Sequence, residues 1–230
     1  MSISIVVPVL NESGNVSNLY EGLERELSHD FEVIFVDGGS SDGTTKELRA
    51  LESHCEEVHA LVREGEDLAE SVLTGFKHAT WTRAVVMDGD MQHPPHKVNE
   101  LVEKLEDNNI VIGTRHDEDG DIEEWTPKRK LISAFGKTYS KIWIRDARQL
   151  SDPMSGFFAV NLNEVNLERL NPKGFKILLE LLADVESKVE EVSYTFQGRL
   201  KGSSSLDWKE AASFLHYVPS LKIRKNRYWN

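Results

Sequence analysis

Two aspartates one residue apart follow an apolar run in the stretch VVMDGDMQHPP, a spacing that suits metal binding. Side chains alternate along an extended chain, so Asp88 and Asp90 point to the same side, and Gln92 can add an amide oxygen there. Proteins commonly hold Mg²⁺ or Mn²⁺ with one or two carboxylates, together with water and substrate phosphate. We interpret the three residues as ligands of a divalent cation, with an ordinary acidic turn as the alternative.

Polar residues also end three other apolar runs, in the segments VPVLNES, VDGGSSDGT and GTRHD. Asp37 begins the glycine turn of the second segment, and we interpret it as a nucleotide contact. Glu12 in the first segment has two readings. It accepts hydrogen bonds from a ribose or base, or it occupies the first turn of a helix, where negative charge is favoured. Arg115 in the third segment, together with Lys128 and Arg129, can bind phosphate.

His93 stands beside the proposed metal ligands and before two prolines. It can be read as a general base, a metal ligand or a turn residue, and we assign it no role. Pro95 is expected to open the next helix. We find no Ser-His-Asp arrangement, thiolate nucleophile or P-loop ending in Gly-Lys-Ser/Thr, which disfavours a covalent hydrolase and a P-loop phosphotransferase.

Composition narrows the class of protein. The 230 residues fit one domain, and the net charge of −12 argues against general binding to nucleic acid, whose phosphates demand a basic face. No stretch approaches the ~20 apolar residues of a membrane-spanning helix. The single cysteine, Cys55, excludes an internal disulfide, and the amino terminus has no signal-peptide pattern, so we expect a cytoplasmic protein.

The elements that must position these residues alternate along the first half of the chain. Short β-branched runs predict strands, and the amphipathic stretches between them predict helices, with a spacing typical of βαβ units. The expected strands are Ile3–Val9, Phe31–Val36, Val58–Val62, Ala84–Met87 and Ile110–Ile112. The expected helices are Val16–Leu27, Thr44–His54, Leu68–Ala79 and Pro95–Leu105. Ligands of such sheets bind at the carboxyl ends of the strands, where the polar segments lie.

The alternation changes after Arg115. The stretch HDEDGDIEEW is expected to be a loop, and Lys130–Trp143 a helix with apolar residues at helical spacing. SGFFAVN and VEEVSYTF read as strands, KGFKILLELLADVES as a helix between them, and Leu206 to about Lys222 as a closing helix. The whole pattern predicts an α/β fold with a Rossmann-like, mostly parallel sheet and helices on both faces.

These motifs are similar to those of a known family. The chain resembles the family 2 glycosyltransferases with the A-type fold, and within them the dolichyl-phosphate sugar transferases, such as dolichol-phosphate mannose synthase and its archaeal relatives. The likeness runs over nearly the whole chain. It rests on VVPVLNE and VDGGSSDGT as nucleotide motifs, DGDMQHPP as metal motif, GTR, KRKLIS and SDPMSGFF towards the acceptor, and GRLKGSSSL as the late Arg-x-x-Gly-x-Ser element. The metal motif and SDPMSGFF together are specific.

The resemblance implies one catalytic domain, with a nucleotide-sugar-binding half at residues 1–115 and an acceptor-binding half at residues 116–230 that ends in a basic amphipathic tail. It implies an inverting transfer of a hexose from a UDP- or GDP-hexose to polyprenyl or dolichyl phosphate, with Mg²⁺ or Mn²⁺ as cofactor. The lipid-linked sugar would serve glycosylation. Asp88, Asp90 and Gln92 would hold the cation, in agreement with the reading from their spacing.

The resemblance also implies roles for the other motif residues. The nucleotide sugar would be bordered by Pro8, Glu12, Asp37, Asp88 and Arg199, with Arg199 against the diphosphate. The lipid phosphate would be received by Arg115, Arg129 and Ser133, while Asp152 and Ser155 would shape the acceptor pocket. The residues expected to take part in catalysis are Asp90, Arg115, Arg129 and Arg199.

The chain departs from the family pattern at four places. Leu10 replaces a common aromatic residue, Gly38 replaces the second acid of an Asp-Asp pair, DLAES replaces a Gly-Leu-Gly, and Ser205 replaces a lysine. The first two departures bear on the donor base, so uridine and guanosine both stay open. A saccharide or protein acceptor, or a nucleotide-sugar-binding protein with degraded catalysis, is the alternative function.

The positive charge of this acidic chain is concentrated in TPKRKLI and in the tail LKIRKNRYW, beside apolar and aromatic residues. This combination suits peripheral binding to an anionic membrane surface. The alternative is a core-facing amphipathic helix with solvated lysines. Under the first reading the enzyme works at the cytoplasmic face of a membrane, with room for a membrane-protein partner.

Overall fold

The computed structural model describes residues 2–65, 67–116, 127–172, 174, 177–184, 188–195 and 214–221. For residue 116 and residues 127–134 it describes the backbone alone. Arg199 and the basic tail, residues 222–230, lie outside the described residues.

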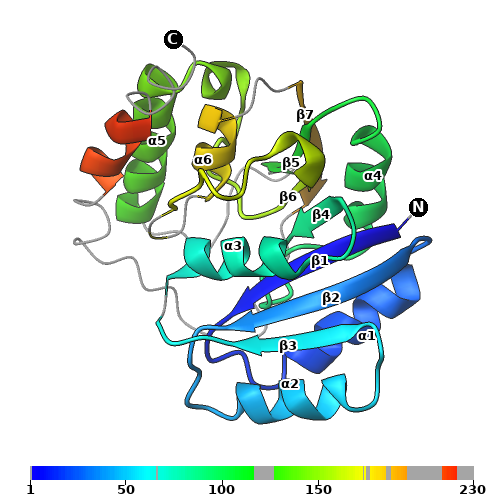
Figure 1. Cartoon of the computed structure of the whole chain (residues 1–230). Helices are drawn as coiled ribbons and strands as arrows, with labels where there is room; N and C mark the ends of the chain where they lie inside the picture. Colours follow the sequence, from blue (N-terminus) through cyan, green and yellow to red (C-terminus); the bar gives the residue numbers. More distant parts are fainter. Residues whose placement is uncertain are drawn as a thin grey trace.

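Within the described residues, seven strands form one sheet in the order β3-β2-β1-β4-β6-β5-β7 (Figure 1). They are β1 (Ser2–Val9), β2 (Asp30–Asp37), β3 (Val58–Val62), β4 (Arg83–Val86), β5 (Ile110–His116), β6 (Phe158–Asn161) and β7 (Val189–Thr195). β6 runs antiparallel to its neighbours β4 and β5, and every other pairing is parallel. The predicted α/β fold with a mostly parallel sheet is confirmed.

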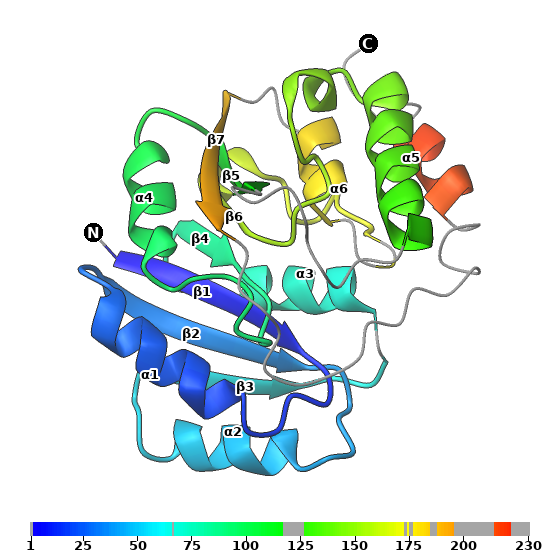
Figure 2. The same cartoon turned by 180° about the vertical axis from the view of Figure 1, so that it is seen from behind.

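The helices connect the strands and cover the sheet on both faces (Figures 1 and 2). They are α1 (Val16–Glu26), α2 (Thr44–Glu52), α3 (Leu68–His78), α4 (Lys97–Lys104), α5 (Pro127–Trp143) and α6 (Ile177–Asp184), with two short 3₁₀ helices, η1 (Asp146–Gln149) and η2 (Leu162–Glu164). Residues 214–221 are also helical and lie beside α5. None of the described helices has the length and apolarity needed to cross a bilayer.

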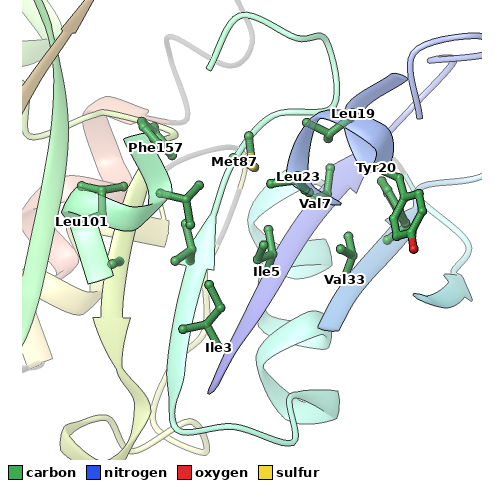
Figure 3. Close-up of a cluster of buried hydrophobic side chains, with 14 of the residues drawn as sticks. Ile3, Ile5, Val7, Leu19, Tyr20, Leu23, Val33, Met87, Leu101 and Phe157 are labelled. Atoms are coloured by element: carbon green, nitrogen blue, oxygen red, sulfur yellow. The ribbon is translucent and has the colours of Figure 1, made fainter. Parts of the chain in front are cut away.

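The alternation of side chains along β1 builds two separate cores. Ile3, Ile5 and Val7 face α1 and α4 in one buried cluster, which Figure 3 shows in close-up. Val6, between them in sequence, faces the other way and joins a second cluster with α3 and α6. A central strand with apolar residues on both faces is expected for a sheet covered by helices on both sides.

The antiparallel direction of β6 has a consequence for the site. Because β6 opposes β4, its amino end lies at the edge of the sheet where the parallel strands have their carboxyl ends. The pair Val86 and Phe158 forms the last register position at this edge. The segment SDPMSGF, which leads into β6, is therefore delivered next to the segment DGD, which leaves β4.

Most predicted elements appear within a few residues of their expected ends, and two helix starts were wrong. The helix expected from Lys130 begins at Pro127. The helix expected from Pro95 begins at Lys97. Pro94 and Pro95 instead form a turn whose carbonyl oxygens accept hydrogen bonds from the backbone N–H groups of Lys97 and Val98. The expected strand Ile110–Ile112 is longer, because its pairing with β7 continues to His116. Of the expected closing helix, residues 214–221 lie within the described part.

Candidate active site

The polar segments that follow the strands meet at one edge of the sheet, as predicted. β1, β2, β4 and β5 run in the same direction, because β6 opposes both β4 and β5. Their carboxyl ends, which carry Glu12, Asp37, Asp88 and Arg115, therefore share an edge. Such an edge is where ligands bind in open α/β sheets.

The loops after β1 and β2 are tied to each other by side chains. The backbone N–H of Asn11 donates to Ser40 Oγ at 2.8 Å, and Asn11 Oδ1 accepts from the backbone N–H of Ser41 at 2.9 Å. The backbone N–H of Glu12 donates to Thr44 Oγ1 at 2.9 Å. Asn11 adopts a positive φ of 56°, a conformation that asparagine tolerates better than most residues. The two loops form one connected rim.

Asp37 is buried and holds its own turn together. Its Oδ1 accepts from the backbone N–H groups of Gly39 and Ser40 at 3.1 and 2.9 Å and from Ser40 Oγ at 2.6 Å, and its Oδ2 accepts from Thr45 Oγ1. These bonds stabilise the turn that faces the β1 loop. The proposed contact of Asp37 with the nucleotide stays a prediction.

Pro8 and Glu12 lie at the end of β1. Pro8 lies opposite Val36 in the register of β1 and β2. The pairing of β1 with β4 has already ended at Val6, so the missing N–H of the proline breaks no hydrogen bond of the β1–β4 ladder. Glu12 Oε2 accepts from Asn15 Nδ2 at 2.6 Å, just before α1 begins at Val16. Both readings of Glu12, as a ligand contact and as a helix-start residue, are compatible with this position.

The segment DGD is packed tightly against the end of β1. A Cβ added to Gly89 would lie 2.8 Å from Val9 Cγ1, so only glycine fits this position without displacement. Asp90 is buried and its Oδ1 accepts from the backbone N–H of Gln92 at 3.1 Å, while the side chain of Asp88 is 39% exposed. Met91, between Asp90 and Gln92, has a positive φ of 65°.

These residues suit a cation that shares its coordination with substrate. Asp88, Asp90 and Gln92 offer only oxygen ligands, the type that Mg²⁺ and Mn²⁺ prefer. In the described part of the chain, no group of three or more His, Cys, Asp or Glu side chains is arranged to hold a metal ion by itself. A cation held by two carboxylates and an amide would keep coordination positions for substrate phosphate and water.

The segment SDPMSGF closes the site from the other side. Ser155 is buried, and its Oγ donates to the carbonyl of Gly113 at 2.7 Å and accepts from the N–H of Phe157 at 3.1 Å. A Cβ on Gly156 would lie 3.3 Å from Asp88 Oδ1, so this glycine backs directly onto the carboxylate. Asp152 is buried and pairs with Lys137 of α5, with 3.5 Å between Oδ2 and Nζ.

The side chains of Ser155 and Asp152 thus fix the loop and α5. Their expected roles in the acceptor pocket stay predictions. The backbone of α5 carries Arg129 and Ser133, but their side chains lie outside the described part of the chain, as does the whole of Arg199. The roles predicted for these three residues remain untested.

Two aromatic rings close to the site, those of Tyr194 and His93, were not predicted as functional. Tyr194 on β7 lies opposite Arg115 in the register of β5 and β7. Burial raises the pKa of the Tyr194 hydroxyl, while the charge and hydrogen bond of Arg115 oppose the rise. His93, for which a turn role was one option, is 1% exposed and packs against Phe157 and Tyr194. Only the alternation of side chains in VEEVSYTF signalled that Tyr194 faces inward.

The DLAES departure has a local explanation. Asp67 precedes α3 and accepts from the backbone N–H groups of Ala69 and Glu70, which caps the helix. Its second oxygen accepts from the N–H of Gly174 at 2.7 Å, and the carbonyl of Gly174 accepts from Ala69 N–H at 2.8 Å. Asp67 therefore joins the start of α3 to Gly174 in the second half of the chain.

Comparisons with known proteins identify the family of this chain. The family model described as glycosyl transferase family 2 matches residues 4–164. A protein named dolichol-phosphate mannosyltransferase from Pyrococcus furiosus is 36% identical over 95% of this chain, which spans 63% of that relative's length. Proteins of the same name from Saccharomyces cerevisiae and Mycosarcoma maydis are 35% and 32% identical over 96% of this chain, which spans 87% and 79% of their lengths.

Solved structures extend the likeness to the fold. Glucosyl-3-phosphoglycerate synthase from Mycobacterium tuberculosis, in complex with Mn²⁺, UDP and glucosyl-3-phosphoglycerate, superposes with a TM-score of 0.71 at 17% identity, over 97% of this chain and 79% of that one. At this identity the likeness supports the fold alone. The family match over more than half of the chain, together with the relatives that span nearly all of it, shows that this chain belongs to glycosyl transferase family 2.

Proposed function

We propose that this chain transfers a hexose from a nucleoside-diphosphate sugar to dolichyl or another polyprenyl phosphate, with inversion at the anomeric carbon. The observation that carries the proposal is its 35% identity to the Saccharomyces cerevisiae relative, over 96% of this chain and 87% of that protein. The shared name of the three relatives makes mannose the first sugar to test. Whether the donor carries UDP or GDP is decided by experiment.

The donor would bind across the ends of β1, β2 and β4. Glu12 and Asp37, with Pro8 beneath them, would border the nucleoside, and Arg199 would lie against the diphosphate. Asp88, Asp90 and Gln92 would hold a divalent cation, Mg²⁺ or Mn²⁺, which supplies charge stabilisation to the leaving diphosphate when bound. The buried position of Asp90 supports this role, because a desolvated carboxylate attracts a cation more strongly than an exposed one.

The acceptor would enter from the side of α5. Arg115 lies at the end of β5, and Arg129 and Ser133 lie about one helical turn apart in the first half of α5. These three residues would receive the lipid phosphate. Such a phosphate is already anionic and needs no strong general base. The arginines would orient it and relieve its repulsion from the donor diphosphate.

A lipid acceptor requires access to a membrane, and the outer face of α5 offers a suitable surface. Phe135 and Ile142 on α5 are 55% and 58% exposed, and Leu215 in the helix beside α5 is 40% exposed. Tyr139 joins the two helices by donating to the carbonyl of Leu215 at 2.8 Å. We define Phe135, Ile142 and Leu215 as the apolar face and propose that it lies on an anionic membrane, with the neighbouring basic segments against the headgroups.

The first experiment measures release of nucleoside diphosphate from UDP- and GDP-sugars. Each donor is tested with and without dolichyl phosphate, and with Mg²⁺, Mn²⁺ or a chelator. Release that requires both the lipid phosphate and a cation is the expected result and names the donor. Release that ignores the lipid would point to a saccharide or protein acceptor, and no release with any donor would contradict the proposed enzyme.

Asp90→Ala provides the matching variant. Loss of the buried carboxylate is expected to lower kcat by at least on the order of a hundredfold, because the leaving diphosphate loses its cation. Asp107→Ala is the control, since Asp107 is exposed and precedes β5 at the opposite edge of the sheet. Turnover that survives Asp90→Ala unchanged would exclude the assigned metal site.

A further inference from the structure

His93 has a buried imidazole that contacts Asp88 of the segment DGD. Its Nδ1 accepts a hydrogen bond from the backbone N–H of Asp88 at 3.0 Å, and its Nε2 lies 3.7 Å from Asp88 Oδ2. Because the backbone group is the donor, Nδ1 carries a lone pair and the ring hydrogen of the neutral imidazole is on Nε2. One ring therefore meets both the backbone and the carboxylate of Asp88.

The ring is clamped by two aromatic side chains, one from the loop before β6 and one from β7. It stacks on Phe157, with ring centroids 4.9 Å apart and planes 12° from parallel, and its edge contacts Tyr194 at 5.8 Å. Phe157 and Tyr194 meet each other edge-on at 5.3 Å. Phe157 belongs to the buried cluster of Figure 3, so the clamp is anchored in the core.

The clamp links the two halves of the proposed site. Phe157 follows Gly156, which backs onto the Asp88 carboxylate, and Tyr194 pairs in register with Arg115. The ring that receives the Asp88 N–H is thus held by the loop before β6 and by the neighbour of the acceptor-side arginine. A shift of the imidazole would move Asp88 relative to both.

Electrostatics keep this imidazole in one state. Burial lowers the pKa of His93 to about 3, the nearby Asp90 charge opposes the decrease and the Arg115 charge adds to it. The ring is therefore neutral at physiological pH and unsuited to act as a general base there.

We propose that His93 is a positioning residue that fixes Asp88 for binding a divalent cation with a nucleoside diphosphate, through the hydrogen bond from the Asp88 N–H to Nδ1. The inference rests on the proposed function, because it concerns the same donor site. The competing explanation is that the ring only fills space in the core.

Two substitutions whose side chains have the same number and branching of non-hydrogen atoms separate these explanations. In His93→Asn the side-chain Oδ1 stands one bond from Cγ, as Nδ1 does, and can accept from the Asp88 N–H. His93→Leu has a similar size and no acceptor, so it leaves a buried N–H without its partner. Both variants lose the stacked ring, so a difference between them reports the hydrogen bond.

The experiment measures binding of Mn²⁺ together with GDP and, separately, together with UDP. Electron paramagnetic resonance of free Mn²⁺ monitors the binding. His93→Leu is expected to weaken binding on the order of tenfold, while His93→Asn stays within about threefold of wild type. Thermal unfolding of each variant checks that the chain is folded. Equal binding by Leu and Asn, whether both are normal or both impaired, would overturn the positioning role and leave the proposed function standing.

The wild-type chain offers a second test, in which a variant serves only to assign one signal. Nitrogen-15 spectra of labelled histidine distinguish the two neutral tautomers, and loss of the signal in His93→Asn identifies His93 among the eight histidines. The hydrogen is expected on Nε2, and adding Mg²⁺ with GDP or UDP should shift the Nδ1 resonance. A hydrogen on Nδ1 would overturn the inference. Absence of any cation–nucleotide binding by wild type would overturn the proposed function as well.

Discussion

At the scale of single residues, the proposed metal site is defined by what lies directly against it. Gly89, the middle residue of the segment DGD, lies against Val9, and Gly156 lies against the Asp88 carboxylate. Neither position has room for a side chain without displacement. Packing therefore explains why glycine occupies these positions in DGD and SGF, independently of backbone conformation.

Gly156→Ala tests this contact. The added methyl group would lie 3.3 Å from Asp88 Oδ1, closer than an ordinary van der Waals contact, so the carboxylate must move by a few tenths of an ångström. We expect kcat to fall roughly tenfold, because small misplacements at a catalytic centre are costly. Steady-state kinetics with a parallel melting curve measure the effect, and unchanged kcat in a folded variant would show that Asp88 tolerates displacement.

At the scale of elements, buried polar groups join neighbouring strands and turns. Glu32 on β2 is buried and accepts from Ser4 Oγ at 2.6 Å, Thr80 N–H at 2.7 Å and Thr80 Oγ1 at 3.0 Å. Burial raises its pKa, but the bonds from Ser4 and Thr80 outweigh that effect, and the net pKa is lowered. The carboxylate thus connects β1 and β2 to the turn before β4.

The lowered pKa fixes the sign of a pH effect. A group whose pKa is lower when folded stabilises the protein above its unfolded pKa, and this contribution is lost as pH falls through the folded pKa. Glu32→Gln is therefore expected to cost about 1–2 kcal/mol in free energy of unfolding at neutral pH, with the deficit shrinking in acid. Urea unfolding at several pH values measures it, with exposed Glu106→Gln as control. A pH-independent deficit would contradict the assignment.

The apolar face of α5 leads to a second prediction at this scale. Phe135→Asp places a charge on the proposed membrane surface and should reduce binding to vesicles containing anionic lipid several-fold. Val62→Asp is the control, because Val62 is 47% exposed at the end of β3, an edge strand of the sheet. Vesicle co-sedimentation compares the two variants. If both bind as wild type does, the membrane contact lies elsewhere on the chain.

At the scale of the whole molecule, donor binding should couple to stability, because the proposed ligands come from distant parts of the chain. A ligand at a hundred times its Kd stabilises the folded state by about 2.7 kcal/mol. For a domain of this size, that corresponds to a rise in Tm of roughly 5–10 °C. Differential scanning fluorimetry with Mn²⁺ and nucleoside diphosphate measures the rise. It should vanish with a chelator and in Asp90→Ala, and a rise that persists in both would place the cation elsewhere.

Much of this fold and site was predictable from sequence because its signals are local. Strand runs end in polar residues, and a parallel α/β sheet brings such ends to one edge, so the strand pattern alone was enough to group Asp37, Asp88 and Arg115. The helix starts Val16, Thr44 and Leu68 were predicted to the residue, whereas α4 and α5 begin two and three residues from their expected starts. At Pro95 the local preference for a first helical position yielded to a turn that delays the helix to Lys97.

The sequence by itself determined the strand and helix order and the residues at the strand ends, because side-chain periodicity and turn chemistry act over a few neighbouring residues. Only the tertiary structure decided that β6 runs antiparallel, which sets Gly156 against Asp88. It also decided that His93 points into the core and packs against Phe157 and Tyr194. Strand direction and burial depend on contacts between distant segments, and no local pattern in a single sequence contains them.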